Sequence, residues 1–295
     1  MGIVKQQPRE YLRIGAHMSV AGGLDLAIDR ALECGFNCLQ IFTHSPRVWA
    51  ARTVSGTEIR AFKRKRNSCG IKPVIVHAPY LPNLASPDEA LWQRSMQVII
   101  TDYALASSLG ADYYVIHPGS TKGLDTAFGV KRVATAVSMI LDTVSSRTVF
   151  LLETTAGGGS SIGSTFTELA DIIAEVRSRV SKARLGICLD SAHVFAAGFD
   201  IRRKEGIKSC IHALQDSTGM RAVKVIHAND SKTECASHHD QHDHIGKGKI
   251  GPRGFRNLMK IAWFRKIPWI LETPKEPEGS DIKNRKTLQR IFRTA

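Results

Sequence analysis

The most constraining feature of this sequence is an alternation of short apolar runs with longer segments in which apolar residues recur at helical spacing. Eight runs are candidate strands, at residues 12–16, 37–42, 73–77, 112–117, 148–153, 185–190, 222–227 and 268–272. Most are continuously apolar, as expected for parallel strands buried on both faces. The alternation predicts an α/β protein.

The segments between these runs predict helices that are apolar on one side. Such faces lie between residues 24 and 32 (Leu24, Ile28, Ala31, Leu32) and between residues 133 and 144. A third helix is expected to start at Thr165, which is spaced from Glu168 as a capping box. Eight strand–helix units in this length predict a (β/α)₈ TIM barrel, with residues 1–295 as a single domain. An open, doubly wound sheet is the main competing fold.

Composition narrows the class of protein. Of 295 residues, 43% are hydrophobic, which supplies enough apolar mass for a core and excludes disorder as the main state. No apolar run approaches the ~20 residues of a membrane-spanning helix, and residues 1–15 are too polar for a signal peptide. The six cysteines include no CxxC pair, which argues against a disulfide scaffold or a thiolate zinc site. We expect a cytoplasmic protein with reduced thiols and no membrane contact.

The charge balance points to an anionic partner. Lys and Arg number 41 against 27 Asp and Glu, a formal net charge of +14. The basic stretches at residues 60–66 and 202–204 are most simply solvated helix faces, and their summed field would assist capture of DNA.

Candidate metal ligands end six consecutive predicted strands. The carboxyl ends of parallel strands share one face, so in a barrel these side chains would surround one opening. Imidazole and carboxylate donors without thiolate favour Zn²⁺, with Mn²⁺ or Fe²⁺ as alternatives. The six residues are His77, His117, Glu153, Asp190, His227 and Glu272.

Three further donors extend this set. His193 follows Asp190 by three positions, which suggests a neighbouring ion. Asp240 and His242 are two apart, so in an extended loop both would point the same way, although His238, His239 and His244 compete for the assignment. The Gly-rich segment 155–165 lacks the lysine of a phosphate loop, and GxSxG does not appear in the strand–turn–helix setting of a serine nucleophile.

At these residues the chain closely resembles the endonuclease IV family of apurinic/apyrimidinic endonucleases. The resemblance runs almost end to end, in order and in spacing. It is carried by GAHMSVAGGL, IFTHSPRVW, HAPYLPNLAS, HPGS, LETTAGGGSSIG, LDSAHVFAAGFD, HANDSK, DQHDHIGKGKIG and LETP.

The resemblance implies a deoxyribonuclease IV on a TIM barrel with three Zn²⁺, with Mn²⁺ as an alternative at one position. His77, His117 and Glu153 would bind the first ion, and Glu153 would bridge to a second. The second ion would be completed by Asp190, His227 and Glu272, and the third would be held by His193, Asp240 and His242. Glu153 and Glu272 would act with a metal-bound hydroxide that attacks phosphorus in line.

By the same resemblance, the substrate is duplex DNA that contains an abasic site. Cleavage 5′ of that site would leave a 3′-OH and a 5′-deoxyribose phosphate for base excision repair, with 3′-end trimming as a further activity. Tyr80 and Leu81 match a loop that wedges into the duplex, and Arg47 matches a residue that fills the gap. The family expectation is a monomer.

The chain departs from the family pattern at Gly158, Ala192, Gln241 and Lys247, where Gln, Cys, Arg and an acidic residue are more usual. None of these is a proposed ligand. Two other functions compete: a divalent-metal sugar isomerase or epimerase on a similar barrel, and a non-catalytic protein that binds damaged DNA. The third donor trio and the net charge argue against the first, and the complete ligand set argues against the second.

Overall fold

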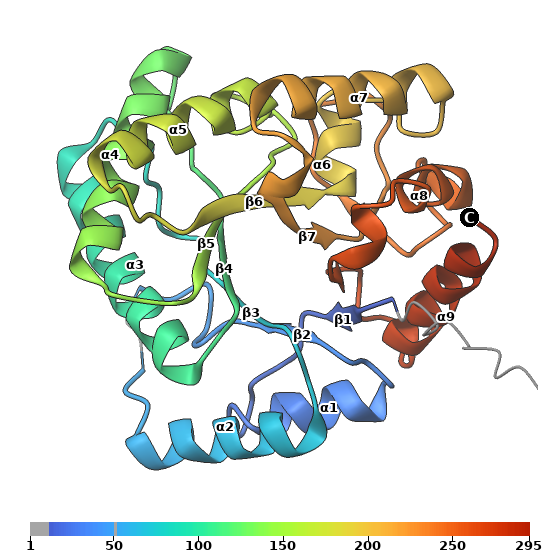
Figure 1. The fold of residues 1–295 in the computed structure, drawn as a ribbon, viewed down its shortest axis with the longest axis horizontal. Coiled ribbons are helices and arrows are strands. Elements are labelled where there is room, and N and C mark those ends of the chain that lie inside the picture. The colour runs from blue at the N-terminus through green and yellow to red at the C-terminus, as the bar shows by residue number, and fades with distance from the viewer. Residues whose placement is uncertain (1–11, 50–51) are drawn as a thin grey trace, which may run out of the picture.

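The computed structural model describes residues 12–49 and 52–295, and within them eight parallel strands form one sheet (Figure 1). Every strand of this sheet lies inside one of the eight predicted apolar runs. The strands are β1 (Ile14–Ala16), β2 (Leu39–Ile41), β3 (Val74–His77), β4 (Tyr113–Ile116), β5 (Val149–Glu153), β6 (Leu185–Asp190), β7 (Val223–His227) and β10 (Trp269–Leu271).

The sheet curls into a nearly closed barrel. Its strand order is β1-β10-β7-β6-β5-β4-β3-β2, and a parallel bridge between His17 and Gln40 brings the two end strands together. The predicted TIM barrel is therefore confirmed, and the open sheet is excluded.

Helices alternate with the strands and form the outer layer (Figure 1). They are α1 (Leu26–Glu33), α2 (Gly56–Cys69), α3 (Glu89–Leu109), α4 (Thr126–Thr143), α5 (Phe166–Arg179), α6 (Ser191–Ala196), α7 (Lys204–Ser217), α8 (Gly251–Met259) and α9 (Ser280–Arg293). Two short 3₁₀ helices, η1 (Met220–Ala222) and η2 (Phe264–Lys266), precede β7 and β10.

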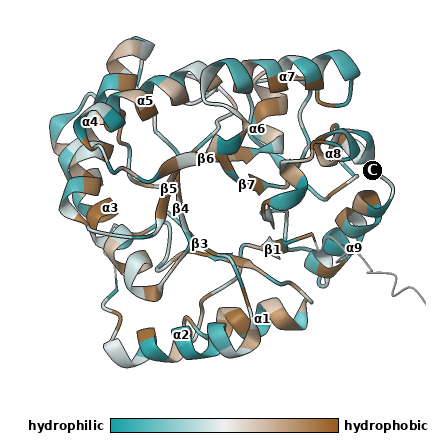
Figure 2. Cartoon of the chain, in the orientation of Figure 1, coloured by the Kyte–Doolittle hydropathy of each residue, from teal (hydrophilic) through white to brown (hydrophobic). Residues whose placement is uncertain are grey.

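Two separate apolar cores hold this arrangement together. The larger lies between the strands and the helices, whose apolar sides face inward in Figure 2. The smaller fills the barrel interior with one residue from each of seven strand segments: Cys38, Ile75, Val115, Leu151, Cys188, Val225 and Ile270. On β1 the equivalent position is Gly15, where a Cβ atom would lie 2.3 Å from the Cys38 carbonyl oxygen. Glycine is required there because the strands approach too closely for a side chain.

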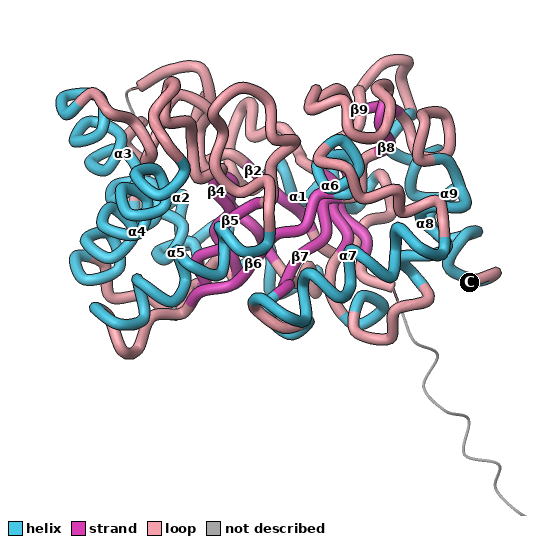
Figure 3. Tube along the Cα trace, turned by 90° about the horizontal axis from the view of Figure 1, so that it is seen from above, coloured by secondary structure: helices cyan, strands magenta, loops and turns pink. Residues whose placement is uncertain are grey.

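The long loops gather at one end of the barrel (Figure 3). A two-stranded antiparallel ribbon of β8 (Asp230–Ser231) and β9 (His242–Asp243) lies among them, and no apolar run had predicted it. This end carries the carboxyl termini of the parallel strands, where active sites of such barrels are found.

The helix predictions are largely confirmed, with two corrections. Thr165 does cap α5 by accepting a hydrogen bond from the Glu168 amide, but the Glu168 carboxylate accepts from the Gly163 and Ser164 amides instead of completing the capping box. Leu32, predicted on the packed face of α1, is 40% exposed, because that face is already filled by Ala27, Ile28 and Ala31.

The prediction that the chain starts without a signal peptide falls mainly on residues 1–11, which lie outside the described residues. Among the described helices, none combines the length and apolarity needed to cross a bilayer.

Candidate metal centre

A ring of polar side chains lies directly above the apolar layer inside the barrel. Successive residues of a strand point to opposite faces, so the residue two positions beyond each interior side chain also points toward the axis. Ile75 is followed in this way by His77, and Leu151 by Glu153. The complete ring takes one residue from each strand or from the position directly after it: His17, Gln40, His77, His117, Glu153, Asp190, His227 and Glu272.

Six members of this ring are the predicted strand-end donors, here called the strand cluster: His77, His117, Glu153, Asp190, His227 and Glu272. Glu153 lies at its centre and is fully buried. Its Oε2 atom lies 3.2 Å from Nε2 of His77 and 3.0 Å from Nε2 of His117, while Oε1 lies 2.7 Å from Nδ1 of His227. One carboxylate thus faces two groups of imidazoles, which suits a ligand shared by two cations.

Backbone carbonyl groups orient three of the histidines. The Nδ1 atom of His77 lies 2.6 Å from the Ala78 carbonyl oxygen, and those of His193 and His242 lie 2.7 Å and 3.2 Å from the carbonyl oxygens of Thr154 and Glu272. A carbonyl oxygen only accepts, so each Nδ1 carries the proton and each Nε2 keeps a lone pair for a cation.

Asp190 is fixed by hydrogen bonds from its own strand end and from the segment that follows β7. Its Oδ1 accepts the amides of Ala192 and His193 at the start of α6, and its Oδ2 accepts from the Asn229 side chain at 2.6 Å. The Asn229 side-chain oxygen in turn accepts the Glu272 amide at 2.9 Å. Asn229 therefore ties together two strand ends, a role that the sequence analysis did not assign to it.

The remaining predicted donors form the outer cluster: His193, Asp240 and His242. One oxygen of Asp240 lies 3.0 Å from Nε2 of His193, and the other lies 3.0 Å from Nε2 of His242. Nε2 of His242 also lies 3.7 Å from Oδ2 of Asp190, so the outer cluster adjoins the strand cluster. Asp240 and His242 thus point toward each other, as side chains two positions apart in an extended segment do.

The loop that carries Asp240 and His242 is anchored at both ends. The buried Asp230 carboxylate accepts hydrogen bonds from the amides of Gly246, Ile250 and Gly251. In the middle of the loop, the His238 amide donates to the Ala196 carbonyl oxygen at 3.0 Å.

Electrostatics concentrate opposite charges at the site. Burial lowers the pKa of His193, but the carboxylates of Asp190 and Asp240 outweigh it and raise this pKa to about 10. The same balance raises the pKa of His242 to about 9. Burial raises the pKa of Glu153, yet the imidazoles of His227 and His117 hold it well below its ordinary value. Glu153 is therefore anionic at neutral pH, and a cation would take the place of the protons on the imidazoles.

The donor set fits divalent metal ions. Ligand atoms lie within 4.8 Å of one another in the groups His77–His117–Glu153, Asp190–His193–His242 and Glu153–Asp190–His227–Glu272. A further group contains Cys188 with Glu153 and His227, but burial raises the pKa of the Cys188 thiol to about 12, which disfavours the thiolate. These residues could hold metal, and their nitrogen and oxygen donors are those preferred by zinc-like ions.

A hollow of about 480 Å³ opens beside both clusters. Tyr80, Leu81, His117, His193 and Asp240 are among the residues that line it. Tyr80 is 62% exposed and its ring meets those of Phe42 and His77 edge to face, with centroids 5.2 Å and 6.1 Å apart. The hollow thus joins an exposed aromatic surface to the proposed metal centre.

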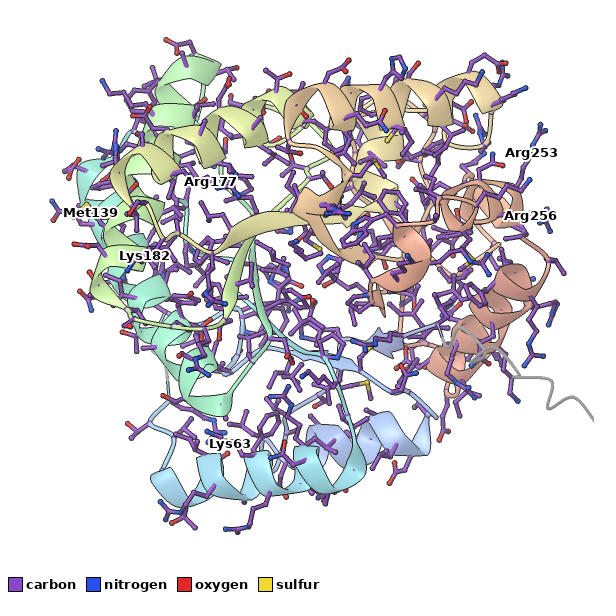
Figure 4. The ribbon with its side chains drawn as sticks, in the orientation of Figure 1. Lys63, Met139, Arg177, Lys182, Arg253 and Arg256 are labelled. Carbon is purple, nitrogen blue, oxygen red and sulfur yellow. The ribbon has the colours of Figure 1, made fainter. Side chains whose placement is uncertain are left out.

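Arg47 lies exposed on the loop after β2. That loop is joined to the neighbouring one because the Tyr80 amide donates to the Pro46 carbonyl oxygen at 3.1 Å. The three predicted DNA-contact residues therefore belong to two adjoining loops on the rim. In contrast, Met139, Arg253 and Arg256 project outward from the surrounding helices in Figure 4.

The structure explains one departure from the family pattern. A Cβ atom at Gly158 would lie 2.7 Å from the carbonyl oxygen of His238, so the loop that carries Asp240 leaves no room for a side chain there. Gln241 and Lys247 are exposed and Ala192 is buried, and nothing in the structure explains these three exchanges.

Two members of the ring, His17 and Gln40, were not predicted from the sequence. Both lie before the third strand, and glutamine is not a usual metal ligand, so the pattern of strand-end donors did not include them. The alternation of side chains along a strand could have identified them, because His17 lies two residues after Gly15 and Gln40 lies two residues after Cys38.

Comparison with known proteins gives consistent results. The profile of a family described as xylose isomerase-like TIM barrels matches residues 28–293. A protein of Halothermothrix orenii named probable endonuclease 4 is 43% identical over 264 residues, which cover 90% of this chain and 94% of that protein. The crystal structure of endonuclease IV from Thermus thermophilus has a TM-score of 0.85 at 35% identity, and the match covers 96% of this chain and 100% of that one.

More distant structures share the barrel. A D-tagatose 3-epimerase-like protein has a TM-score of 0.72 at 20% identity, covering 96% of this chain and 98% of that chain. At this level of identity the similarity describes the fold alone.

Proposed function

Because this chain belongs to the endonuclease IV family and is a deoxyribonuclease of DNA repair, we propose that it uses three Zn²⁺ to hydrolyse the phosphodiester 5′ to an abasic site in duplex DNA. The products would be a 3′-OH and a 5′-deoxyribose phosphate. The observation that carries the proposal is the convergence of nine imidazole and carboxylate donors at one end of the barrel.

We assign the donors as their contacts suggest. His77, His117 and Glu153 would hold one ion, Glu153, Asp190, His227 and Glu272 a second, and His193, Asp240 and His242 a third. Zinc bound there supplies positive charge to a phosphodiester and acidifies water at neutral pH. Mn²⁺ could replace it at one position, since both ions accept this mixture of nitrogen and oxygen donors.

The protein side chains set the geometry of this chemistry. Glu153 faces both groups of imidazoles, so the first two positions share one rigid carboxylate. The backbone carbonyl groups that accept from His77, His193 and His242 hold these rings in the productive tautomer. Glu272 reaches the site from the last strand, and we assign it with Glu153 to the reacting face, where their charges position the attacking water.

Substrate selection would come from DNA shape, since an abasic nucleotide has no base edge. Such a nucleotide costs less to extrude because its stacking and pairing are already lost. We propose that Tyr80 and Leu81 enter the duplex beside the hollow and that Arg47 fills the vacated space. The net charge of +14 would strengthen capture of the phosphate backbone. Trimming of blocked 3′ ends would use the same centre, because the bond cleaved is again a phosphodiester.

The sugar epimerase hypothesis is disfavoured by the outer cluster. An enzyme that moves a proton on a free sugar needs no third group of donors on a separate loop, yet Asp240 contacts both His193 and His242. The similarity to an epimerase-like structure concerns the barrel alone.

The decisive experiment is incision of a duplex oligonucleotide that carries one abasic analogue, with zinc supplied and a matched intact duplex as control. We expect one cut, 5′ of the analogue, and near three equivalents of zinc in the purified protein. An uncut abasic duplex would overturn the proposal, and turnover of free ketoses would support the epimerase instead. The monomeric state expected for this enzyme is checked by light scattering.

A further inference from the structure

Gln40 lies on β2 in the polar ring and is fully buried, although it is not one of the proposed metal ligands. Its side chain makes three polar contacts. Oε1 lies 2.8 Å from Nε2 of His227, and Nε2 lies 2.6 Å from Oε1 of Glu272 and 3.1 Å from Nδ1 of His17. All three polar contacts of the Gln40 amide are thus with other residues of the polar ring: His227, Glu272 and His17.

The chemistry of the neighbours fixes which way this amide points. Oε1 of Glu272 lies 2.6 Å from the amide, and a carboxylate that binds a cation offers only acceptor oxygens. If the amide were turned over, its oxygen would face the Glu272 oxygen at 2.6 Å, and two acceptors would repel each other. The NH₂ group must therefore face Glu272 and His17, which leaves the amide oxygen for His227.

This orientation determines where His227 carries its proton. An amide oxygen only accepts, so Nε2 of His227 must donate to Gln40. Nδ1 then lies on the opposite side of the ring, 2.7 Å from Glu153 and 3.2 Å from Glu272, where a cation would bind. In His77, His193 and His242, by contrast, a backbone carbonyl oxygen accepts the proton of Nδ1, which leaves Nε2 to bind a cation.

We propose that Gln40 is a positioning residue of the metal centre, which commits His227 to bind metal through Nδ1 and simultaneously restrains the Glu272 carboxylate. Nδ1 of His17 accepts the second hydrogen of the Gln40 amide, which prevents the amide from rotating by 180°. The inference rests on the metal centre proposed above. It is specific to the second ion, since His227 and Glu272 are both assigned to that ion.

Two substitutions separate the two halves of this role. Gln40→Met keeps the length of the side chain but removes its polar contacts with His227, Glu272 and His17. Gln40→Glu retains an acceptor for His227 while it removes the donor to Glu272. Cys38→Ala is the matched control, because Cys38 points into the same barrel two residues earlier and belongs to the apolar layer.

The first readout is zinc affinity, measured by chelator competition on the full chain. We expect Gln40→Met to bind one of three zinc ions about 10–100-fold more weakly, the range for residues that support a metal ligand. Gln40→Glu should also weaken that ion, whereas Cys38→Ala should bind all three as the native protein does. Equal affinity of Gln40→Met and native protein would overturn the inference.

The second readout is the tautomer of His227 in zinc-loaded native protein labelled with ¹⁵N-histidine. We expect a proton on Nε2 and metal on Nδ1, with the same pattern in Gln40→Glu. A proton on Nδ1 in the native protein would refute the role of Gln40 even if no variant folds. Failure of the proposed function itself has a different signature, because native protein would then bind no zinc at these histidines.

Discussion

The strand cluster and the outer cluster hold similar donors by different means. Glu153 stands at the end of a barrel strand and its side chain is fully buried, whereas the Asp240 side chain is 45% exposed on a loop. The first is positioned by the register of the sheet, and the second depends on the β8–β9 ribbon and on the anchor at Asp230. The two cation positions proposed for the strand cluster are therefore set by the sheet, whereas the third depends on the loop.

Removing Glu153 should have the largest effect, because it is the one donor shared by two proposed ions. For Glu153→Ala we expect loss of two zinc equivalents and incision slower by about 1,000-fold or more, as when a group that stabilises transition-state charge is deleted. Elemental analysis and single-turnover incision measure both. Glu175→Ala is the control, since Glu175 lies on the outer helix α5 and pairs with Arg179. Retention of all three ions would remove Glu153 from the centre.

Asp240→Asn tests whether the outer cluster holds its own ion. We expect this variant to lose one zinc equivalent and to keep two, with incision slower by about 100-fold, because the strand cluster does not require the loop. The exposed neighbour Gln241, changed to Ala, should keep three equivalents. If Asp240→Asn loses all its zinc, the two clusters are one cooperative unit and the distinction between them is wrong.

Tyr80→Ala should leave both clusters intact and weaken recognition. Its exposed ring rests on Phe42 and His77 and is proposed to stack in the duplex. We expect binding of an abasic duplex to fall about 10-fold, within the range for loss of one stacking aromatic side chain, with zinc content unchanged. Fluorescence anisotropy measures the affinity. Met139→Ala, on the outside of α4, should bind as the native protein does.

The smallest expected effect concerns pH and the metal-free protein. The pKa values of His193 and His242 are raised to about 10 and about 9, so their protonated forms stabilise the folded state below the unfolded value near 6.5. That stability should be lost as pH rises through 9 to 10. We expect the melting temperature of chelator-treated protein to fall by about 2–5 °C between pH 7 and pH 10. A smaller fall in zinc-loaded protein would support the outer cluster as a cation site.

Most of the fold could be predicted because buried parallel strands leave a continuous apolar signature. The ribbon of β8 and β9 could not, since Asp230–Ser231 and His242–Asp243 are too short and too polar to produce one. Leu32 was misplaced because helical spacing alone does not show which side of an apolar face the neighbouring elements already cover.

The nine candidate ligands could be named from strand ends and from family resemblance, whereas their supports could not. Gln40 sits inside an apolar strand, and Asn229 follows a proposed ligand without being one. Their roles depend on hydrogen bonds between residues far apart in the chain, such as Asn229 to Asp190 and Gln40 to Glu272, which no local pattern encodes.

Side chains along each barrel strand alternate between inward and outward directions, so a strand cannot gain or lose one residue without reversing those that follow. Leu151 and Glu153 both face the axis only because one residue separates them. Deletion or insertion of a single amino acid within β5 would turn that carboxylate toward the helices and expose an aliphatic side chain to the ions. Substitutions on the outer helices do not reverse any side chain at the site. We therefore expect related enzymes to vary in the sequence of these helices, while each barrel strand keeps its length.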